Sequence, residues 1–187
     1  EDSSEISALL KNSSGPYTVY GGGTGITGGA VAASGWLIST EKLKSLKIDP
    51  AAMAAQAGAG VTLDELSSEL EKYGLWYPVD STEGSATIAG NFCTNAWGTR
   101  SFKYGSVRSF ALSAEVVFSD GSVEVFKRGG QKASGLECSL KNGKKFKLFD
   151  LASRFNYKNS SGYFMKKDMD LLDLFIGSEG TLGIISS

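Results

Sequence analysis

The most informative stretch of the chain is a glycine-rich loop, Gly21-Gly22-Gly23-Thr24-Gly25-Ile26-Thr27-Gly28-Gly29. Six of its nine residues are glycine. It directly follows a short apolar run at residues 17–20 (Tyr-Thr-Val-Tyr). Because glycine has no side chain, a ligand can approach the bare backbone, and successive N–H groups can form a concave nest for an anion. The loop contains no lysine or arginine. It therefore predicts a phosphate site held by backbone dipoles and by the hydroxyls of Thr24 and Thr27.

Two common phosphate motifs come close to this loop. A Walker loop needs a lysine after its second glycine, but Gly28 is followed by Gly29 and Ala30. The spacing Gly23-x-Gly25-x-x-Gly28 matches the dinucleotide fingerprint, which must open a helix of about three turns. Residues 28–35 are too short and too rich in glycine for that helix, and a new apolar run begins at Trp36. We therefore expect a phosphate loop between two strands, with no crossover helix.

Three further segments complete a pattern: residues 77–91, residues 94–98 followed by Lys103-Tyr104-Gly105, and residues 177–185. With the glycine loop, and in this order, they resemble the FAD-binding domain of the vanillyl-alcohol-oxidase type (PCMH-type). Within that superfamily the chain is most similar to the glycolate oxidase and D-lactate dehydrogenase branch of FAD-linked oxidases. The resemblance runs over nearly the whole chain, from about residue 5 to residue 185.

The resemblance implies an α+β fold of two subdomains with FAD between them. Residues 1–78 would form a small α/β unit that carries the pyrophosphate loop, and residues 79–187 an antiparallel subdomain. The family pattern begins with a strand before the first helix and continues into a C-terminal cap domain that carries the substrate site. We expect both to be missing from these 187 residues.

Local patterns agree with this division. Helices are predicted from the cap at Asp2 to Leu10 and, after a Thr62–Glu65 capping box, over residues 63–73. Strands are expected at residues 17–20, 36–39, 53–61 and 183–186. Asp120-Gly121 and Asn142-Gly143 predict hairpins joining 110–118 to 122–126 and 136–140 to 145–149. Residues 129–162 look like an insertion into the family pattern.

The glycine loop suits the pyrophosphate of FAD, and short polar groups near the subdomain boundary suit ribityl hydroxyls or flavin edges. Gly90 would allow close backbone approach, and the segment from Glu179 resembles the part of the family that lines the cofactor. The candidate cofactor contacts are Gly21, Gly22, Gly23, Thr24, Gly25, Ile26, Thr27, Gly28, Pro78, Asp80, Ser81, Ser85, Thr87, Gly90, Asn91, Thr94, Asn95, Glu179, Gly180, Ile184 and Ile185.

These residues also have ordinary structural interpretations. Ser, Thr and Asn in a glycine-rich stretch commonly cap turns and helices. Glu179 could cap a helix, residues 103–105 could form a simple turn, and Cys93 could be a small buried thiol. Trp97 and Ala89 stand where the family usually has smaller residues, so this wall of the site is expected to differ.

The chain carries 19 Lys and Arg against 20 Asp and Glu, unevenly: residues 1–98 have 5 basic and 11 acidic side chains, and residues 99–187 have 14 and 9. The basic residues 127, 128, 132, 141, 144, 145 and 147 are expected to form a solvated face, not a nucleic-acid site. Histidine is absent, and the two cysteines show no metal spacing. We therefore expect FAD to be bound non-covalently and no metal to be held. No apolar run is long enough to span a membrane.

The resemblance implies the cofactor domain of a flavin-dependent oxidoreductase whose parent enzyme oxidises a 2-hydroxy acid such as glycolate or D-lactate. The residues assign no catalytic group, and the fragment alone is expected to be inactive. An Fe–S or other electron-transfer partner and a cytoplasmic location, peripheral to the membrane within a complex, fit the family. The alternative is a non-catalytic flavin-binding subunit or module of a multi-subunit complex.

Overall fold

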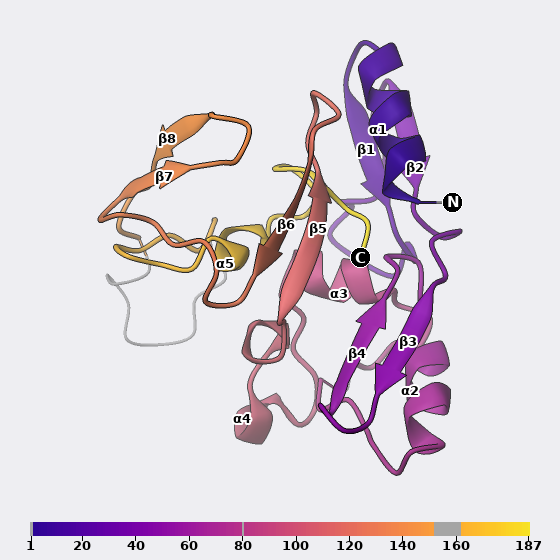
Figure 1. Ribbon diagram of the computed structural model, residues 1–187. Coiled ribbons are helices and arrows are strands. Elements are labelled where there is room, and N and C mark those ends of the chain that lie inside the picture. Colours follow the sequence, from indigo (N-terminus) through magenta and orange to yellow (C-terminus); the bar gives the residue numbers. More distant parts are fainter. Residues whose placement is uncertain (1, 80, 152–161) are drawn as a thin grey trace.

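The computed structural model describes residues 2–79, 81–151 and 162–187 (Figure 1). Strands β1 (Tyr17–Tyr20) and β2 (Trp36–Ser39) pair in parallel, from Tyr17 opposite Trp36 to Tyr20 opposite Ser39. Residues 21–35, which join them, contain no helix. The predicted phosphate loop without a crossover helix is thus confirmed, although β1 is half-buried along its length and not buried.

The first half of the chain adds two helices and a second strand pair. Helix α1 (Ser3–Asn12) begins at Asp2, whose carboxylate accepts two N–H groups of the first turn, and it runs two residues beyond the predicted end. Helix α2 (Leu63–Glu71) has the predicted capping box at Thr62. Strands β3 (Leu46–Asp49) and β4 (Ala54–Ala57) form an antiparallel hairpin. Strand β3 was not predicted, and β4 is shorter than the strand expected at residues 53–61.

Three short helices lie within and after the segment that the sequence marked for cofactor contacts. They are α3 (Ile88–Thr94), α4 (Ser101–Tyr104) and the 3-10 helix η1 (Val107–Ser109). The α4 helix carries the Lys103-Tyr104-Gly105 motif, which is therefore a helix end with Gly105 at positive φ. Asn95, also at positive φ, ends α3.

Both predicted hairpins are present. Strands β5 (Ser113–Val117) and β6 (Val123–Lys127) turn at Asp120-Gly121, and β9 (Ile184–Ile185) pairs with β5 to give the antiparallel order β6-β5-β9. Strands β7 (Glu137–Ser139) and β8 (Lys145–Lys147) form the second hairpin, which projects to one side of the molecule in Figure 1. Helix α5 (Leu172–Phe175) precedes β9.

The main core lies around the β6-β5-β9 sheet. Val116, Val117, Phe126 and Ile184 on this sheet are fully buried, and Leu172 of α5 packs into the same cluster, which extends to α1 and β2. A smaller cluster beneath α2 gathers its apolar face with β3 and β4. Because the main cluster draws residues from both halves of the chain, it fixes α3 and the glycine loop relative to β9.

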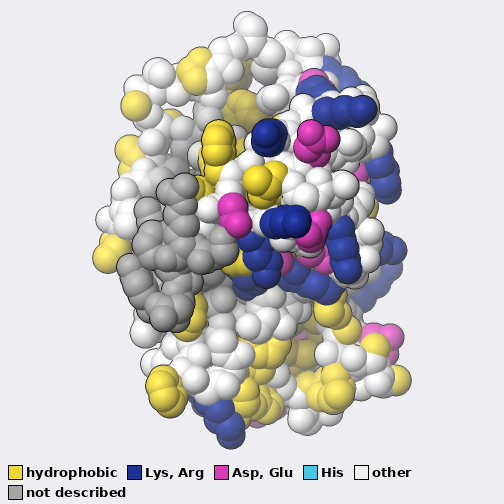
Figure 2. All heavy atoms as spheres, turned by 90° about the vertical axis from the view of Figure 1, so that its left-hand side faces the viewer, with side chains coloured by type: hydrophobic (Ala, Val, Ile, Leu, Met, Phe, Trp, Pro, Cys, Tyr) yellow, Lys and Arg dark blue, Asp and Glu magenta, His cyan; other side chains and the backbone are white. Residues whose placement is uncertain are grey.

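The side of the molecule that carries the β7–β8 hairpin is rich in basic side chains (Figure 2). The six lysines of the predicted solvated face are exposed: Lys127, Lys132, Lys141, Lys144, Lys145 and Lys147. Arg128 is exposed as well, but its guanidinium also lies 2.8 Å from the Asp173 carboxylate. Among the described residues no helix is both long and apolar enough to cross a bilayer.

Candidate functional site

The glycine loop packs directly against the turn before α3. A Cβ added at Gly21 would lie 2.7 Å from the Thr87 hydroxyl, and one added at Gly22 would lie 2.7 Å from the Ser85 carbonyl oxygen. Real Cβ atoms do not come this close, so glycine is required at both positions for the loop to lie there. Gly25 differs, since a Cβ there meets nothing within 4 Å and its φ is not in the left-handed region. Gly25 therefore faces open space, and not a strained turn.

The main-chain N–H groups of this loop find no hydrogen-bond partner in the described part of the chain. From Gly21 to Ala30, no main-chain N–H donates a hydrogen bond to any acceptor within residues 2–79, 81–151 and 162–187. The first such bond in the segment is from Val31 N–H to the Gly28 carbonyl. Polar main-chain groups are rarely left without partners unless water or a ligand supplies them. The loop thus presents a row of donors with nothing in the fold to accept them.

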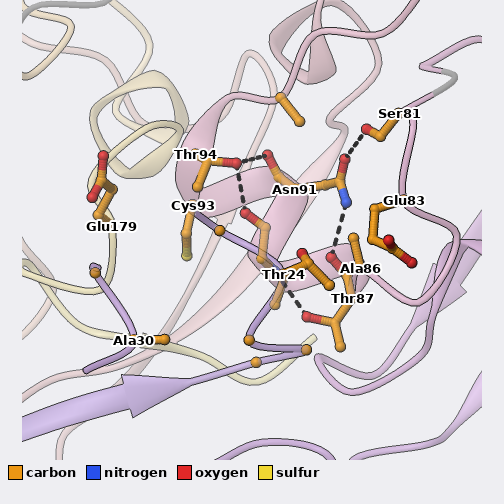
Figure 3. Close-up of a pocket in the computed structure, with 18 of the residues that line it drawn as sticks. Thr24, Ala30, Ser81, Glu83, Ala86, Thr87, Asn91, Cys93, Thr94 and Glu179 are labelled. Carbon is orange, nitrogen blue, oxygen red and sulfur yellow. Dashed lines mark hydrogen bonds between the residues drawn. The ribbon is translucent and has the colours of Figure 1, made fainter. Parts of the chain in front are cut away.

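The opposite side of the site is helix α3, whose polar side chains bond to one another (Figure 3). Thr87 is the N-cap and accepts the N–H of Gly90 at 3.2 Å. Asn91 is 3% exposed; its amide donates to the Thr87 carbonyl at 3.2 Å, and its oxygen accepts the Ser81 hydroxyl at 2.7 Å. Thr94 donates to the Gly90 carbonyl at 2.9 Å. The capping interpretation of these residues therefore holds for their hydrogen bonds, even though they line the site.

The pKa values of two ionisable groups on this side of the site are shifted further from neutral pH. Burial raises the pKa of the Cys93 thiol to about 12, with a smaller contribution from the negative charge of Glu179. Hydrogen bonds from the Ser85 side chain and main chain lower the pKa of Glu83. Cys93 is therefore a protonated thiol and Glu83 a carboxylate at neutral pH, and neither is suited to take a proton there.

The third wall is the turn from Gly177 to Gly180, docked on the C-terminal end of α3. Gly177 N–H donates to the Phe92 carbonyl at 3.1 Å and Glu179 N–H to the Cys93 carbonyl at 2.9 Å. Glu179 has φ +52 and lies outside any helix, so it is not a helix cap. Its carboxylate faces the glycine loop, where a Cβ on Gly29 would lie 3.3 Å from Glu179 Oε2. In Figure 3, Glu179 lies across the site from Ser81 and Glu83.

These three walls enclose a cavity of about 280 Å³. Most of the predicted contacts line it: Gly21, Gly22, Gly23, Thr24, Gly25, Thr27, Ser81, Thr87, Gly90, Asn91, Thr94, Glu179, Gly180 and Ile185. No lysine or arginine is among the described lining residues. The described part of the chain also contains no group of acidic and cysteine side chains that could hold a metal ion.

Several predicted contacts lie elsewhere for clear physical reasons. Ile26 points fully into solvent, and Ile184 is buried in the core while its strand neighbour Ile185 faces the cavity. Asn95 is occupied as the left-handed end of α3, and Ser85 bonds to Glu83. Gly28 and Pro78 do not line the cavity either. Asp80 lies outside the described residues.

Other lining residues were not among the predicted cofactor contacts, although Ala89 and Trp97 were expected in a wall of the site. These additional lining residues are Val19, Gly29, Ala30, Thr40, Thr82, Glu83, Ala86, Ala89, Cys93, Ala96 and Trp97. On α3 a signal was available, because Ala89, Gly90, Cys93 and Thr94 lie three or four residues apart and so share one face. No helix was predicted there, so that shared face was missed. Val19 and Thr40 lie on or beside the paired strands, and only the parallel pairing of β1 and β2 brings them together.

Comparisons with known proteins agree with this architecture. A family model described as "FAD binding domain" matches residues 1–127. A D-lactate dehydrogenase from Archaeoglobus fulgidus is 38% identical over 189 aligned residues, which cover 99% of this chain and 35% of that protein. A D-2-hydroxyglutarate dehydrogenase from Xanthomonas citri pv. viticola is 36% identical over 168 residues, 88% of this chain and 29% of that protein.

Among solved structures, an alkyldihydroxyacetonephosphate synthase superposes with a TM-score of 0.63 at 22% identity, covering 97% of this chain and 30% of that one. At that identity the likeness shows the fold alone, an architecture of mixed helices and sheets. The chain belongs to the FAD binding domain family. It spans about a third of the length of the curated relatives it matches.

Proposed function

We propose that this chain binds FAD non-covalently, with the pyrophosphate on the main chain of residues 21–27. The observation that carries the proposal is the row of loop N–H groups that find no acceptor among the described residues, beside a cavity whose described lining includes no lysine or arginine. An anion held there has to be bound by backbone dipoles, for which such a row is suited. Non-covalent binding is supported by the absence of histidine and by the protonated state of Cys93.

The remaining walls fit the rest of the cofactor. Small residues on α3, Ala89 and Gly90 among them, leave room for a flat group, and the Thr87 hydroxyl donates to no acceptor among the described residues. A cavity of about 280 Å³ is at the small end for a ligand pocket, about 300–1,000 Å³. We therefore expect part of the FAD to extend beyond the enclosed volume, where its ring would be exposed to water.

The parent enzyme is proposed to oxidise a 2-hydroxy acid of the glycolate or D-lactate type. Two relatives that cover nearly all of this chain are named as dehydrogenases of D-lactate and D-2-hydroxyglutarate. FAD, when bound, supplies a hydride acceptor. This chain positions the cofactor and shields it, but neither Glu83 nor Cys93 is suited to take the substrate hydroxyl proton. We assign substrate activation to a cap domain, and flavin reoxidation to an electron-transfer partner such as an Fe–S protein, in a cytoplasmic enzyme.

The division into subdomains at residues 78 and 79 is part of the same proposal. It is supported by the change from the β1–β2 and β3–β4 pairs to the β6-β5-β9 sheet. The cavity draws its lining from both sides of that division.

An absorbance titration tests the cofactor assignment. The purified chain, freed of cofactor and titrated with FAD, should acquire a flavin spectrum that remains after gel filtration. Acid precipitation should then leave the yellow colour in the supernatant. A protein that takes up no flavin would overturn the assignment, and colour in the pellet would contradict non-covalent binding.

Anaerobic bleaching tests the role of this chain in catalysis. Glycolate, D-lactate or 2-hydroxyglutarate, added to the FAD-loaded chain, should leave the flavin oxidised, because neither Glu83 nor Cys93 is suited to remove the hydroxyl proton and substrate activation is assigned to the cap domain. Dithionite should bleach the same sample and so show that the flavin is reducible. Rapid bleaching by a hydroxy acid would place the catalytic groups within residues 1–187, and Glu179 and Tyr104 would be the first to mutate.

A further inference from the structure

Arg108, in the 3-10 helix η1, does not line the cavity, but most of its side chain is buried. Its side chain is 19% exposed, and burial lowers the pKa of its guanidinium, an effect opposed by the charge of Asp173. The guanidinium also lies over the Phe164 ring, with the central carbon 4.1 Å from the ring centroid. Desolvating a charge is costly unless its donors are well used, so the partners of this side chain matter.

Those partners are main-chain carbonyls at the end of α5. One terminal nitrogen donates to the Asp173 carbonyl at 2.6 Å, and the other donates to the Ile176 carbonyl at 2.7 Å. The first nitrogen also lies 3.1 Å from the Asp173 carboxylate. A planar guanidinium holds two acceptors at a fixed separation. Arg108 thus fixes the last turn of α5 immediately before the cavity wall at Gly177–Gly180.

The same residue is tied to α3, on which that wall is docked. Arg108 N–H donates to the Asn95 side-chain oxygen at 3.3 Å, and Asn95 ends α3. The carbonyls of Phe92 and Cys93, near the same end of the helix, accept the N–H groups of Gly177 and Glu179. Arg108 therefore bridges the two elements between which the wall is held.

We infer that Arg108 is a positioning residue for the cofactor cavity, which acts by clamping the α5 carbonyls so that Glu179 and Gly180 stand opposite the glycine loop. The inference rests on the proposed FAD site for its consequence, but its geometry is independent of any ligand. Asn95, predicted as a direct contact, acts in this arrangement through Arg108.

Substituting Asp173 separates the effect of the two carbonyl contacts of Arg108 from the effect of its ion pair. Its carboxylate contacts both Arg108 and Arg128, the latter at 2.8 Å. Asp173→Asn removes both ion pairs but leaves the two carbonyl contacts of Arg108 in place. Arg108→Lys keeps the charge and the ion pair, but a single ammonium cannot span both carbonyls. Arg108→Met removes all of these contacts while keeping an apolar stem.

Amide hydrogen exchange, resolved residue by residue, reports the clamp directly. In Arg108→Lys and Arg108→Met, protection of the Gly177 and Glu179 amides should fall at least about tenfold, because local opening exposes these groups. Amides of the β5–β6 hairpin should keep their protection, and Asp173→Asn should resemble the parent protein at Gly177 and Glu179. The Kd for FAD should rise at least about tenfold in both Arg108 variants and by less than that in Asp173→Asn.

Unchanged exchange at both amides in Arg108→Lys would overturn the inference, as would equal losses in Arg108→Lys and Asp173→Asn. If Arg108→Met does not fold, the lysine variant decides the question alone. If the parent protein takes up no FAD, the proposed function fails, while the exchange measurement still tests the clamp.

Discussion

The two long sides of the cavity use opposite strategies. The glycine loop, residues 21–30, offers main-chain N–H groups that bond to nothing in the described fold. The α3 side offers polar side chains that are already bonded to one another, with Asn91 between Ser81 and Thr87. One side has unused donors and almost no side chains, whereas the other has side chains whose hydrogen bonds are largely satisfied.

This difference separates binding from stability. A change on the loop that leaves the backbone path intact should weaken ligand binding without unfolding the protein. A change to a buried polar side chain on α3 should cost stability first, because its partners are within the protein. The contact between the two sides, at Gly21 and Gly22 against residues 85–87, should affect both.

The largest effect is expected where the two sides touch. Gly22→Ala puts a Cβ 2.7 Å from the Ser85 carbonyl oxygen, a main-chain atom that cannot turn away. We expect a loss of about 3 kcal/mol in unfolding free energy, at the upper end for overpacking, and a loss of measurable FAD binding. Gly25→Ala, the same change three residues on, should stay within about 0.5 kcal/mol of the parent. Denaturant unfolding of the pair checks this, and equal stabilities would refute the close packing.

The next effect concerns the thiol on the helix side. With the pKa of Cys93 near 12, alkylation by iodoacetamide at pH 9 should be at least about a hundredfold slower in the folded than in the unfolded chain, since only the thiolate reacts. The folded pKa is raised, so the stability linked to this group is complete below the unfolded pKa, about 9. It is lost as pH rises from there towards 12. Peptide mass spectrometry separates Cys93 from Cys138, and equal folded and unfolded rates at Cys93 would contradict its raised pKa.

A smaller effect is expected from the side chain that holds the α3 side together. Asn91→Leu keeps the branched shape of the side chain but removes the acceptor of the Ser81 hydroxyl and the donor to the Thr87 carbonyl. The unfolding free energy should fall by about 2 kcal/mol, and FAD affinity by less than tenfold. Ser81→Ala, which removes only one of these bonds, should cost less. A variant of parental stability that has lost most of its FAD affinity would show that Asn91 serves the ligand and not the fold.

Sequence patterns recovered the parts of this molecule that depend on local chemistry. The loop between β1 and β2, the capped helices α1 and α2, and both hairpin turns follow from glycine, capping residues and Asp-Gly or Asn-Gly pairs. Strand β3 was not predicted, because the alternation in Leu46–Asp49 covers only four residues. It can be recognised as a strand only through its pairing with β4. Helix α3 was not predicted, because its glycine and threonine were interpreted as ligand contacts.

The sequence could predict which segments form the site, but not which side chains in those segments point toward the cavity. Ile184 and Ile185 look equivalent in the chain and both are buried, yet only Ile185 lines the cavity, because strand alternation points them to opposite faces. The role of Arg108 depends on carbonyls 65 and 68 residues further along the chain. No local pattern encodes such a contact, so it could only come from the structure.

The smallest expected change, Gly25→Val, tests the comparison most directly. From the sequence alone, the effect of this substitution would be attributed to backbone strain. However, Gly25 has no positive φ, and a Cβ added to it would meet no atom within 4 Å. The fold should therefore tolerate valine, and the new side chain would occupy space that borders the cavity. FAD affinity should fall at least about tenfold, which corresponds to about 1.4 kcal/mol, while the unfolding midpoint stays near that of the parent. Ile26→Val, on a neighbouring residue that points wholly into solvent, is the matched control and should change neither quantity. If Gly25→Val binds FAD like the parent protein in a fluorescence titration, the pyrophosphate does not approach this part of the loop, and the unused N–H groups must be satisfied by water.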